Sequence, residues 1–476
     1  MKKFTVLALA ALLVVAFTVP ASALENIFGG YWHTRFVAQK NFDGDDGGAT
    51  KGVANVREVN TRTRLYYTAK INDNLKLVNK FEMDTVWGNK DVTALGGGAT
   101  GALTTGTTNW GDVGADGIAV EIKNSYADFN VGPVNFLVGI QNYTLGRGFI
   151  SNDDASGMKA IWKVNDGLYL PFVWQKAKEG AAGNHANEKD IDMYVFAPII
   201  MLSKDIKLAP YYAFMHAKDG ALMGNQKQTW PANFNPTESA TQVYNLFNNI
   251  NASIAGIDFD ANFGASSIWF TGIKQFGSVQ DATGALTGKV NAEIDLKGYL
   301  VAAGGKFDFG KGNVHGQAFY ATGEEETSAR PYGDKEINAY FTTSSNTYYW
   351  AEIMGGGSFD WLSGGSGIST TSRNAPGLAP SNILAVNLGV TVKPMAKMSV
   401  TADLWYAKLA EEIKFANGRK SDKLGTEIDL KVTYQLVEGL TLDVIGAYLF
   451  AGDATSVDGT NDKNPIEAGM QLTLSF

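Results

Sequence analysis

Residues 424–434 read Leu-Gly-Thr-Glu-Ile-Asp-Leu-Lys-Val-Thr-Tyr, and this stretch decides the fold. The apolar side chains are Ile428, Leu430, Val432 and Tyr434, and the polar ones between them are Glu427, Asp429, Lys431 and Thr433. A period of two predicts a β-strand with one apolar and one polar face. The same alternation recurs at 56–67, 75–87 and 291–300, so strands dominate the whole chain.

The connections between the expected strands alternate between short and long. Short turns are expected at 72–74, 131–133, 165–167, 203–205, 394–396 and 438–439. Long polar stretches lie at 88–116, 218–248, 278–290, 323–381 and 453–464. This alternation is typical of an up-and-down transmembrane β-barrel, whereas a β-sandwich has no reason to show it.

Turns and periods together predict about 18 strands, an even number as in bacterial barrels. The expected strands are 27–38, 55–70, 75–87, 117–130, 134–146, 156–164, 168–178, 189–202, 206–217, 250–262, 265–277, 291–309, 313–322, 382–393, 397–409, 424–436, 440–452 and 465–476. The apolar run 348–354 would add a strand and break the even count. We therefore assign it to a long loop, 323–381, that is extracellular or folded inward.

The first residues have the pattern of a secretory signal peptide. Lys2 and Lys3 precede an apolar run, and Ala21-Ser22-Ala23 resembles a cleavage site. We expect residues 1–23 to be removed and 24–476 to form a single antiparallel barrel. After the signal, no apolar run reaches the 18 residues of a candidate spanning helix. The chain has no Cys, which excludes disulfides and thiolate metal sites.

The last strand ends in an aromatic residue. Its apolar face consists of Met470, Leu472, Leu474 and Phe476. A closing strand of this kind resembles the assembly signal of outer-membrane barrels. Residues 424–476 are similar to the closing hairpin of the alginate-export porin family, and the whole chain resembles the major porins of deltaproteobacteria. This resemblance implies one barrel of 18 strands with charged side chains in its channel.

If alternate residues face lipid, their polar neighbours face the lumen. The expected pore-lining residues are Arg35, Arg62, Arg64, Lys76, Lys80, Glu82, Asp84, Glu121, Lys123, Glu293, Asp295, Lys297, Glu427, Asp429 and Lys431. Arg62 and Arg64 lie on the strand next to Glu82 and Asp84. Opposed rows of charge would produce a transverse field that tunes ion selectivity. The plainer interpretation is that these groups pair with one another and solvate the wall.

These features predict a porin of the Gram-negative outer membrane that passes small hydrophilic solutes or ions. A dedicated exporter or importer of an anionic polysaccharide is the alternative, although its lumen should be mainly basic. A barrel that sheathes an electron-transfer partner is a third. We expect no enzyme, because the four His form no metal-ligand pair and no catalytic motif occurs.

The expected partners follow from that assignment. They are outer-membrane lipid, lipopolysaccharide and the barrel-assembly machinery. Both a monomer and a homotrimer are compatible with the sequence. We expect no cofactor and no metal. The net charge of −8 argues against binding to nucleic acid.

Overall fold

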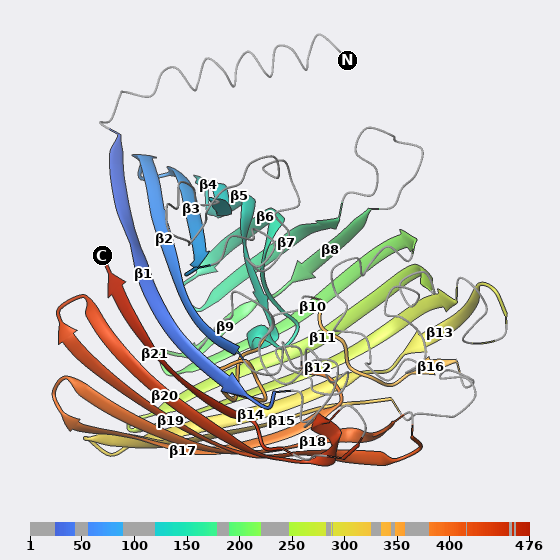
Figure 1. Ribbon diagram of the computed structural model, residues 1–476. Helices are drawn as coiled ribbons and strands as arrows, with labels where there is room; N and C mark the ends of the chain where they lie inside the picture. Colours follow the sequence, from blue (N-terminus) through green and yellow to red (C-terminus); the bar gives the residue numbers. More distant parts are fainter. Residues whose placement is uncertain are drawn as a thin grey trace, which may run out of the picture.

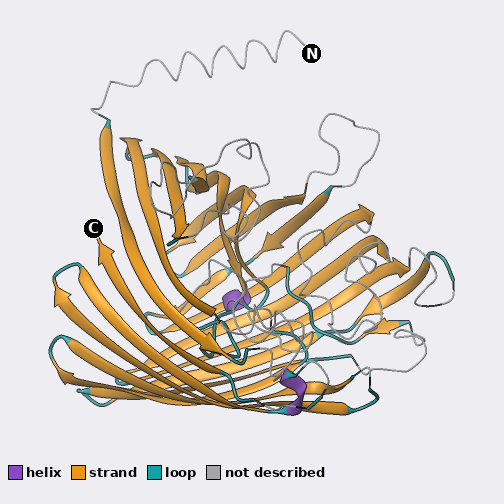
Figure 2. Cartoon of the chain, viewed as in Figure 1, coloured by secondary structure: helices purple, strands orange, loops and turns teal. Residues whose placement is uncertain are grey.

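A computed structural model describes residues 24–42, 56–88, 120–178, 190–219, 247–281, 287, 289–324, 335–343, 348–357, 380–415, 417–456, 459–460 and 463–476. The expected signal peptide, 1–23, lies outside the described residues. The described part is almost entirely β-strand, with two short 3₁₀ turns (Figure 2). No helix among these residues is long and apolar enough to cross a membrane.

The strands succeed one another around a single antiparallel sheet (Figure 1). The first half consists of β1 (Glu25–Lys40), β2 (Val56–Asn72), β3 (Leu75–Val86), β4 (Glu121–Val131), β5 (Val134–Leu145), η2 (Gly146–Gly148), β6 (Ser151–Asn165), β7 (Leu168–Lys178), β8 (Ile191–Phe196), β9 (Ile199–Ser203) and β10 (Ile206–Asp219). The second half consists of β11 (Phe247–Phe263), β12 (Ser266–Asp281), β13 (Ala292–Leu296), β14 (Tyr299–Asp308), β15 (Gly312–Ala321), β16 (Glu336–Ile337), β17 (Ile383–Met395), β18 (Met398–Lys414), β19 (Lys420–Val437), β20 (Leu440–Ala451), η5 (Asp453–Thr455) and β21 (Ile466–Ser475).

The sheet closes into a barrel at the seam between β1 and β21. Strand β1 pairs with β2 on one edge and with β21 on the other, in register from Tyr31 opposite Ser475 to Lys40 opposite Ile466. Phe476 extends the seam, because its N–H donates to the Gly30 carbonyl and its carbonyl accepts from the Gly30 N–H. In the described segments, both edges of the wall are thereby paired, as a spanning sheet requires.

The predicted fold class is confirmed. In the described segments, β8 with β9 and β13 with β14 are each one interrupted strand, and without β16 the wall has 18 strands. The first interruption falls at Ala197–Pro198, where proline has no N–H for the ladder. The second falls at Gly298. An added Cβ there would lie 2.7 Å from the Ala339 carbonyl, so a segment from elsewhere in the chain approaches closely.

That segment belongs to the long connection between β15 and β17. Its described parts, 335–343 and 348–357, pack against the inner wall, and we call them together the inward segment. The short strand β16 pairs in parallel with β13, a pairing that the sequence did not suggest. Residues 348–354, the run that we assigned to a loop, form no strand in the structure.

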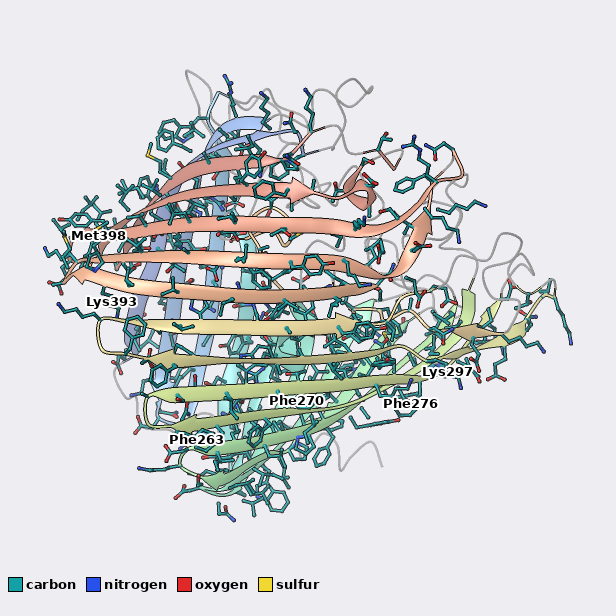
Figure 3. All side chains as sticks on the ribbon, turned by 90° about the horizontal axis from the view of Figure 1, so that it is seen from below. Phe263, Phe270, Phe276, Lys297, Lys393 and Met398 are labelled. Carbon is teal, nitrogen blue, oxygen red and sulfur yellow. The ribbon has the colours of Figure 1, made fainter. Side chains whose placement is uncertain are left out.

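The two faces of the wall differ in chemistry. Along β17 and β18 the outward side chains Leu388, Leu404 and Tyr406 are 63%, 49% and 47% exposed, whereas the inward Trp405 is buried. Phe270 lies on the outer face of β12, partway between Met398 at the short-turn end and Lys297 at the opposite end (Figure 3). A continuous exposed apolar surface of this kind needs an apolar solvent.

Tight turns define one end of the barrel. Gly132 and Gly439 have positive φ angles of 58° and 77° in the turns after β4 and β19. Only glycine adopts this left-handed conformation without steric cost, so these positions allow short connections. The described strand ends that lead into the longer connections lie at the opposite end, which we call the long-loop end.

Candidate functional site

A network of ion pairs lies on the inner face of β2 and β3. The register places Arg62 opposite Asp84 and Arg64 opposite Glu82. Arg62 binds Asp84 through two bonds, Nε to Oδ1 at 2.8 Å and Nη2 to Oδ2 at 2.7 Å. Its Nε is also 3.3 Å from Glu82 Oε2, and Arg64 donates to the same carboxylate. The opposed charges therefore pair directly, as bidentate geometry favours.

Neighbouring strands extend this network. Lys123 on β4 has its Nζ 3.9 Å from Glu82 Oε1 and 3.6 Å from Asp154 Oδ2. Arg35 on β1 is 1% exposed, and its Nε donates to Asn60 Oδ1 at 2.9 Å. Arg64 and Lys123 retain 28% and 29% side-chain exposure, so the network borders on the open lumen while its centre is buried.

A second cluster, on β19, holds the inward segment in place. Glu427 accepts hydrogen bonds from the main-chain N–H groups of Ile353 and Met354 at 2.5 and 2.9 Å, and it is fully buried. Asp429 accepts from the Glu352 N–H at 3.3 Å. Buried backbone donors need such partners. These carboxylates are therefore anchors for the 350–357 segment, and the water-lining role expected for them is wrong because that segment covers them.

Aromatic rings join the inward segment to the wall and to the connection after β5. Phe149 stacks on Tyr348 with ring centres 3.9 Å apart. Trp350 packs edge-on against Phe319 of β15 and Trp405 of β18, with ring centres 5.5 and 5.2 Å apart. Burial raises the pKa of Tyr348 to about 12, so its hydroxyl stays neutral and donates to Gln317 at 2.6 Å. The rings form a rigid apolar body inside the barrel.

The inward segment is also anchored where it leaves the wall. Just after β15, Glu324 accepts hydrogen bonds from the N–H groups of Asn338 and Ala339 at 2.6 and 3.3 Å. Burial raises the pKa of this carboxyl, and the two N–H donors oppose that shift. Tyr340 adds a hydrogen bond of 3.0 Å to the Phe149 carbonyl. The contacts of the inward segment thus reach from η2 to β19.

Arg147 reaches across the inner face from the short connection after β5. Its Nη2 lies 2.8 Å from Asp260 Oδ1 on β11, and its guanidinium stacks over Trp269 at 4.8 Å. The residue has a positive φ of 55° between Gly146 and Gly148, a backbone that turns the side chain inward. By sequence alone, Gly146-Arg147-Gly148 indicates no more than a simple turn. Two glycines flanking one arginine were the only signal of its inward position.

The structure places most of the expected lining residues on the inner face, opposite the exposed apolar side chains. These are Arg35, Arg62, Arg64, Lys76, Lys80, Glu82, Asp84, Glu121, Lys123, Glu427, Asp429 and Lys431. Met470, Leu472, Leu474 and Phe476 lie on the outer face of the closing strand.

Three residues differ from expectation. Glu293, Asp295 and Lys297 lie on the outer face near the long-loop end, because the inward positions of β13 are Ala292, Ile294 and Leu296. Alternation alone does not say which face is inner. Here the apolar face packs against the inward segment, and the charged face points out beyond the apolar surface.

In the segments that the structure describes, no three His, Asp or Glu side chains are grouped as a metal site. The barrel also contains His315 on β15, whose Nε2 lies 2.9 Å from Asp403 Oδ1 on β18. The other ring nitrogen, Nδ1, contacts Asn313 Oδ1 at 2.9 Å, and Asn387 donates to the same Asp403 oxygen at 2.9 Å. The inner face is thus a set of fixed charges and anchored loops.

No protein-family model matches the chain, and no curated protein sequence matches it. Solved structures do. OccAB4 of Acinetobacter baumannii is similar over 96% of this chain and 100% of its own, with a TM-score of 0.54 and 10% identity. OccK8 (OprE) of Pseudomonas aeruginosa is similar over 95% of this chain and 98% of its own, with a TM-score of 0.52 and 8% identity. A BenF-like porin of Pseudomonas fluorescens Pf-5 is similar over 95% of this chain and 99% of its own, with a TM-score of 0.51 and 10% identity. At such identities the likeness establishes the fold alone.

Proposed function

We propose that the chain is an outer-membrane porin, a passive channel for small hydrophilic solutes or ions. One observation carries the proposal: a closed ring of strands has an apolar outer face, and its inner face is charged along β1 to β4. A soluble barrel would expose the polar face and bury the apolar one. The arrangement here is inverted, which fits hydrocarbon outside and water inside.

The number of strands supports a channel. At 18 strands a barrel is too wide for side chains from the wall alone to fill it, so water occupies what the loops leave. The inward segment covers the inner face of β19, whereas Arg64, Lys76 and Lys123 on β2 to β4 stay partly exposed. We therefore assign the water path to the charged sector, the inner face of β1 to β4.

The two ends of the barrel differ in the length of their connections, and this difference supports an orientation in the membrane. Transmembrane barrels have short periplasmic turns and long extracellular loops. We accordingly assign the end with Gly132 and Gly439 to the periplasm. The apolar outer face of β21 supports the expected role of Met470, Leu472, Leu474 and Phe476 as an assembly signal for the barrel-assembly machinery. Lipid and lipopolysaccharide are the expected surroundings, and a homotrimer stays an alternative to a monomer.

The other functions have weaker support. The similarity of 424–476 to the alginate-export family stays a prediction, and export of a polyanion calls for a mainly basic lumen. The charged sector instead pairs Arg62 and Arg64 with Glu82 and Asp84. A sheath around a protein partner needs the space that the inward segment fills. A catalytic role is not part of the proposal.

Reconstitution into planar bilayers tests the proposal. Refolded full-length mature protein should produce discrete, ohmic current steps in KCl. Its reversal potential in asymmetric salt should be small, as expected of a mixed-charge lumen. Protein that is folded, as judged by heat-modifiable migration in gels, and yet conducts no current would refute the channel.

A further inference from the structure

Three buried carboxyl groups lie together where the inward segment touches the wall. Glu427 and Asp429 are inward residues of β19, and Glu467 is an inward residue of β21. They are 0%, 7% and 1% exposed. The Glu427 and Asp429 carboxyl groups hydrogen-bond one another, and Glu467 interacts electrostatically with both. Buried acids of this kind need a cation or a proton to balance them.

The surroundings of this cluster add further negative charge. Asp403 of β18 lies directly opposite Asp429, and Glu352 of the inward segment interacts electrostatically with Asp429 and Glu467. The other described side chains that adjoin the cluster are neutral Gln39 on β1, Trp405 on β18, Ala447 and Leu449 on β20, Lys431 two positions along β19, His315 bound to Asp403, and exposed Asp453 on η5. Acids therefore outnumber cations among the described residues around it.

A hydrogen bond between two carboxyl groups contains a proton. An ionised carboxylate only accepts, so Glu427 and Asp429 bond one another only if one of them is protonated. Glu427 is suited to be the charged member, since it already accepts the N–H groups of Ile353 and Met354. Among the described residues, the buried Asp429 Oδ1 has no hydrogen-bond partner. A proton on Asp429 turns this group into a donor and removes the unmet demand.

We propose that this shared proton is a latch for the inward segment, and that its loss at alkaline pH releases the segment and widens the channel. With the proton in place, Glu427 holds the Ile353 and Met354 N–H groups, and Asp429 holds that of Glu352. When the proton leaves to hydroxide in the lumen, two negative charges face one another at hydrogen-bonding distance in a buried site. Movement of the segment admits water between them and relieves the repulsion. The latch regulates the proposed channel and rests on that function.

The pH dependence of single-channel conductance tests the latch. The full mature chain in planar bilayers should conduct more at about pH 9 than at about pH 6, because a proton shared by two buried carboxylates is lost in this range. Protection factors of the Ile353 and Met354 amides, corrected for the intrinsic pH dependence of exchange, should fall by at least about tenfold over the same range. Conductance and protection that stay constant with pH would overturn the proposal.

Asp429→Asn identifies the group that holds the proton. The amide is neutral at every pH, it can donate to Glu427, and its oxygen can still accept from the Glu352 N–H. Conductance of this variant should stay at the low-pH value of the parent throughout the range. A response to pH as large as that of the parent would overturn the assignment.

Asp443→Asn is the matched control. Asp443 is an inward carboxylate of the neighbouring strand β20, and its partner is the Thr433 hydroxyl rather than a carboxyl group. This variant should keep the full pH response. A loss of response equal to that of Asp429→Asn would reduce the effect to general lumen charge and overturn the latch.

Glu467→Gln tests the cluster independently of the shared pair. One like charge fewer beside the pair weakens its hold on the proton. The rise in conductance should therefore begin at a lower pH than in the parent. A rise that begins at the same or a higher pH would overturn the arrangement of charges on which the latch depends.

Three further outcomes separate the proposals. Conductance that responds to calcium and EDTA but not to pH would place a metal ion between the carboxyl groups and overturn the proton. A protein that conducts equally at every pH keeps the channel and loses the latch. A protein whose amide protection falls with pH as expected, and yet conducts nothing, loses the channel and keeps the latch.

Discussion

The carboxylate of Glu427, on the barrel wall, accepts a hydrogen bond of 2.9 Å from the main-chain N–H of Met354 in the inward segment. A second bond, from the Ile353 N–H at 2.5 Å, reaches the other oxygen of the same carboxylate. One side chain thus satisfies two buried backbone donors. This relationship turns a predicted pore-lining charge into the anchor of the segment that narrows the lumen.

Replacing Glu427 should release that segment. Glu427→Leu leaves two buried N–H groups without an acceptor, at a cost of about 1–3 kcal/mol each. We expect amide hydrogen exchange at Ile353 and Met354 to accelerate by at least about tenfold, and the single-channel conductance to rise. Glu427→Gln keeps one acceptor oxygen, so its exchange rate and its conductance should lie between those of the parent and those of the leucine variant. Unchanged exchange in the leucine variant would show that the segment is held by its aromatic contacts alone.

The charged sector should set ion selectivity. Glu82→Gln with Asp84→Asn leaves Arg62 and Arg64 without these carboxylates and leaves Lys123 with Asp154 alone. We expect the K⁺ to Cl⁻ permeability ratio to fall by at least about twofold, because each screened charge contributes about 0.5 kcal/mol to a passing ion. The reversal potential in asymmetric KCl measures this ratio.

The outer-face carboxylates provide the matched control for that experiment. Glu293→Gln with Asp295→Asn removes the same number of charges from the opposite face of the wall. Selectivity should be unchanged. An equal shift in the two double variants would mean that net charge alone, and not position in the lumen, sets the reversal potential.

Depth in the membrane should decide the cost of a charge on the outer face. Leu388, 63% exposed, lies near the middle of β17, and Met395, 55% exposed, lies at its short-turn end. Leu388→Arg should lower the free energy of unfolding from lipid vesicles by about 2–4 kcal/mol, and Met395→Arg by about 0–1 kcal/mol. Reversible urea denaturation in vesicles measures both. Equal costs would contradict a bilayer centred on this face.

Close packing against Tyr211 should make Gly256 intolerant of a methyl group. Gly256→Ala places a Cβ 2.3 Å from the Tyr211 ring, so the ring must move. We expect a loss of about 1–3 kcal/mol in the free energy of unfolding. Gly446→Ala is the control, since nothing lies within 4 Å of the added Cβ. That variant should differ from the parent by less than about 0.5 kcal/mol. Similar losses in both variants would show that contact with the Tyr211 ring is not the cause.

The order of strands along the wall could be predicted from the sequence because the signals are local. Alternation between Ile428, Leu430 and Val432 sets the faces of a strand, and turn residues such as Gly439 set its end. Each of the 18 wall strands in the described segments overlaps its expected range, and the ends differ by several residues at most. Closure follows from the same pattern, because an apolar outer face in lipid tolerates no unpaired edge.

The site could be predicted only in part, since alternation separates two faces without saying what covers each. For Arg62 and Asp84 the polar face meets the lumen, as expected. For Glu293 and Asp295 the apolar face turns inward against a distant segment. The sequence by itself determined strands, faces and turns, because those depend on neighbours along the chain. Only the tertiary structure decided that Glu427 is covered, that Asp429 binds the Glu352 N–H and that Arg147 reaches Asp260. Those outcomes depend on contacts between residues up to 113 positions apart, which no local pattern encodes.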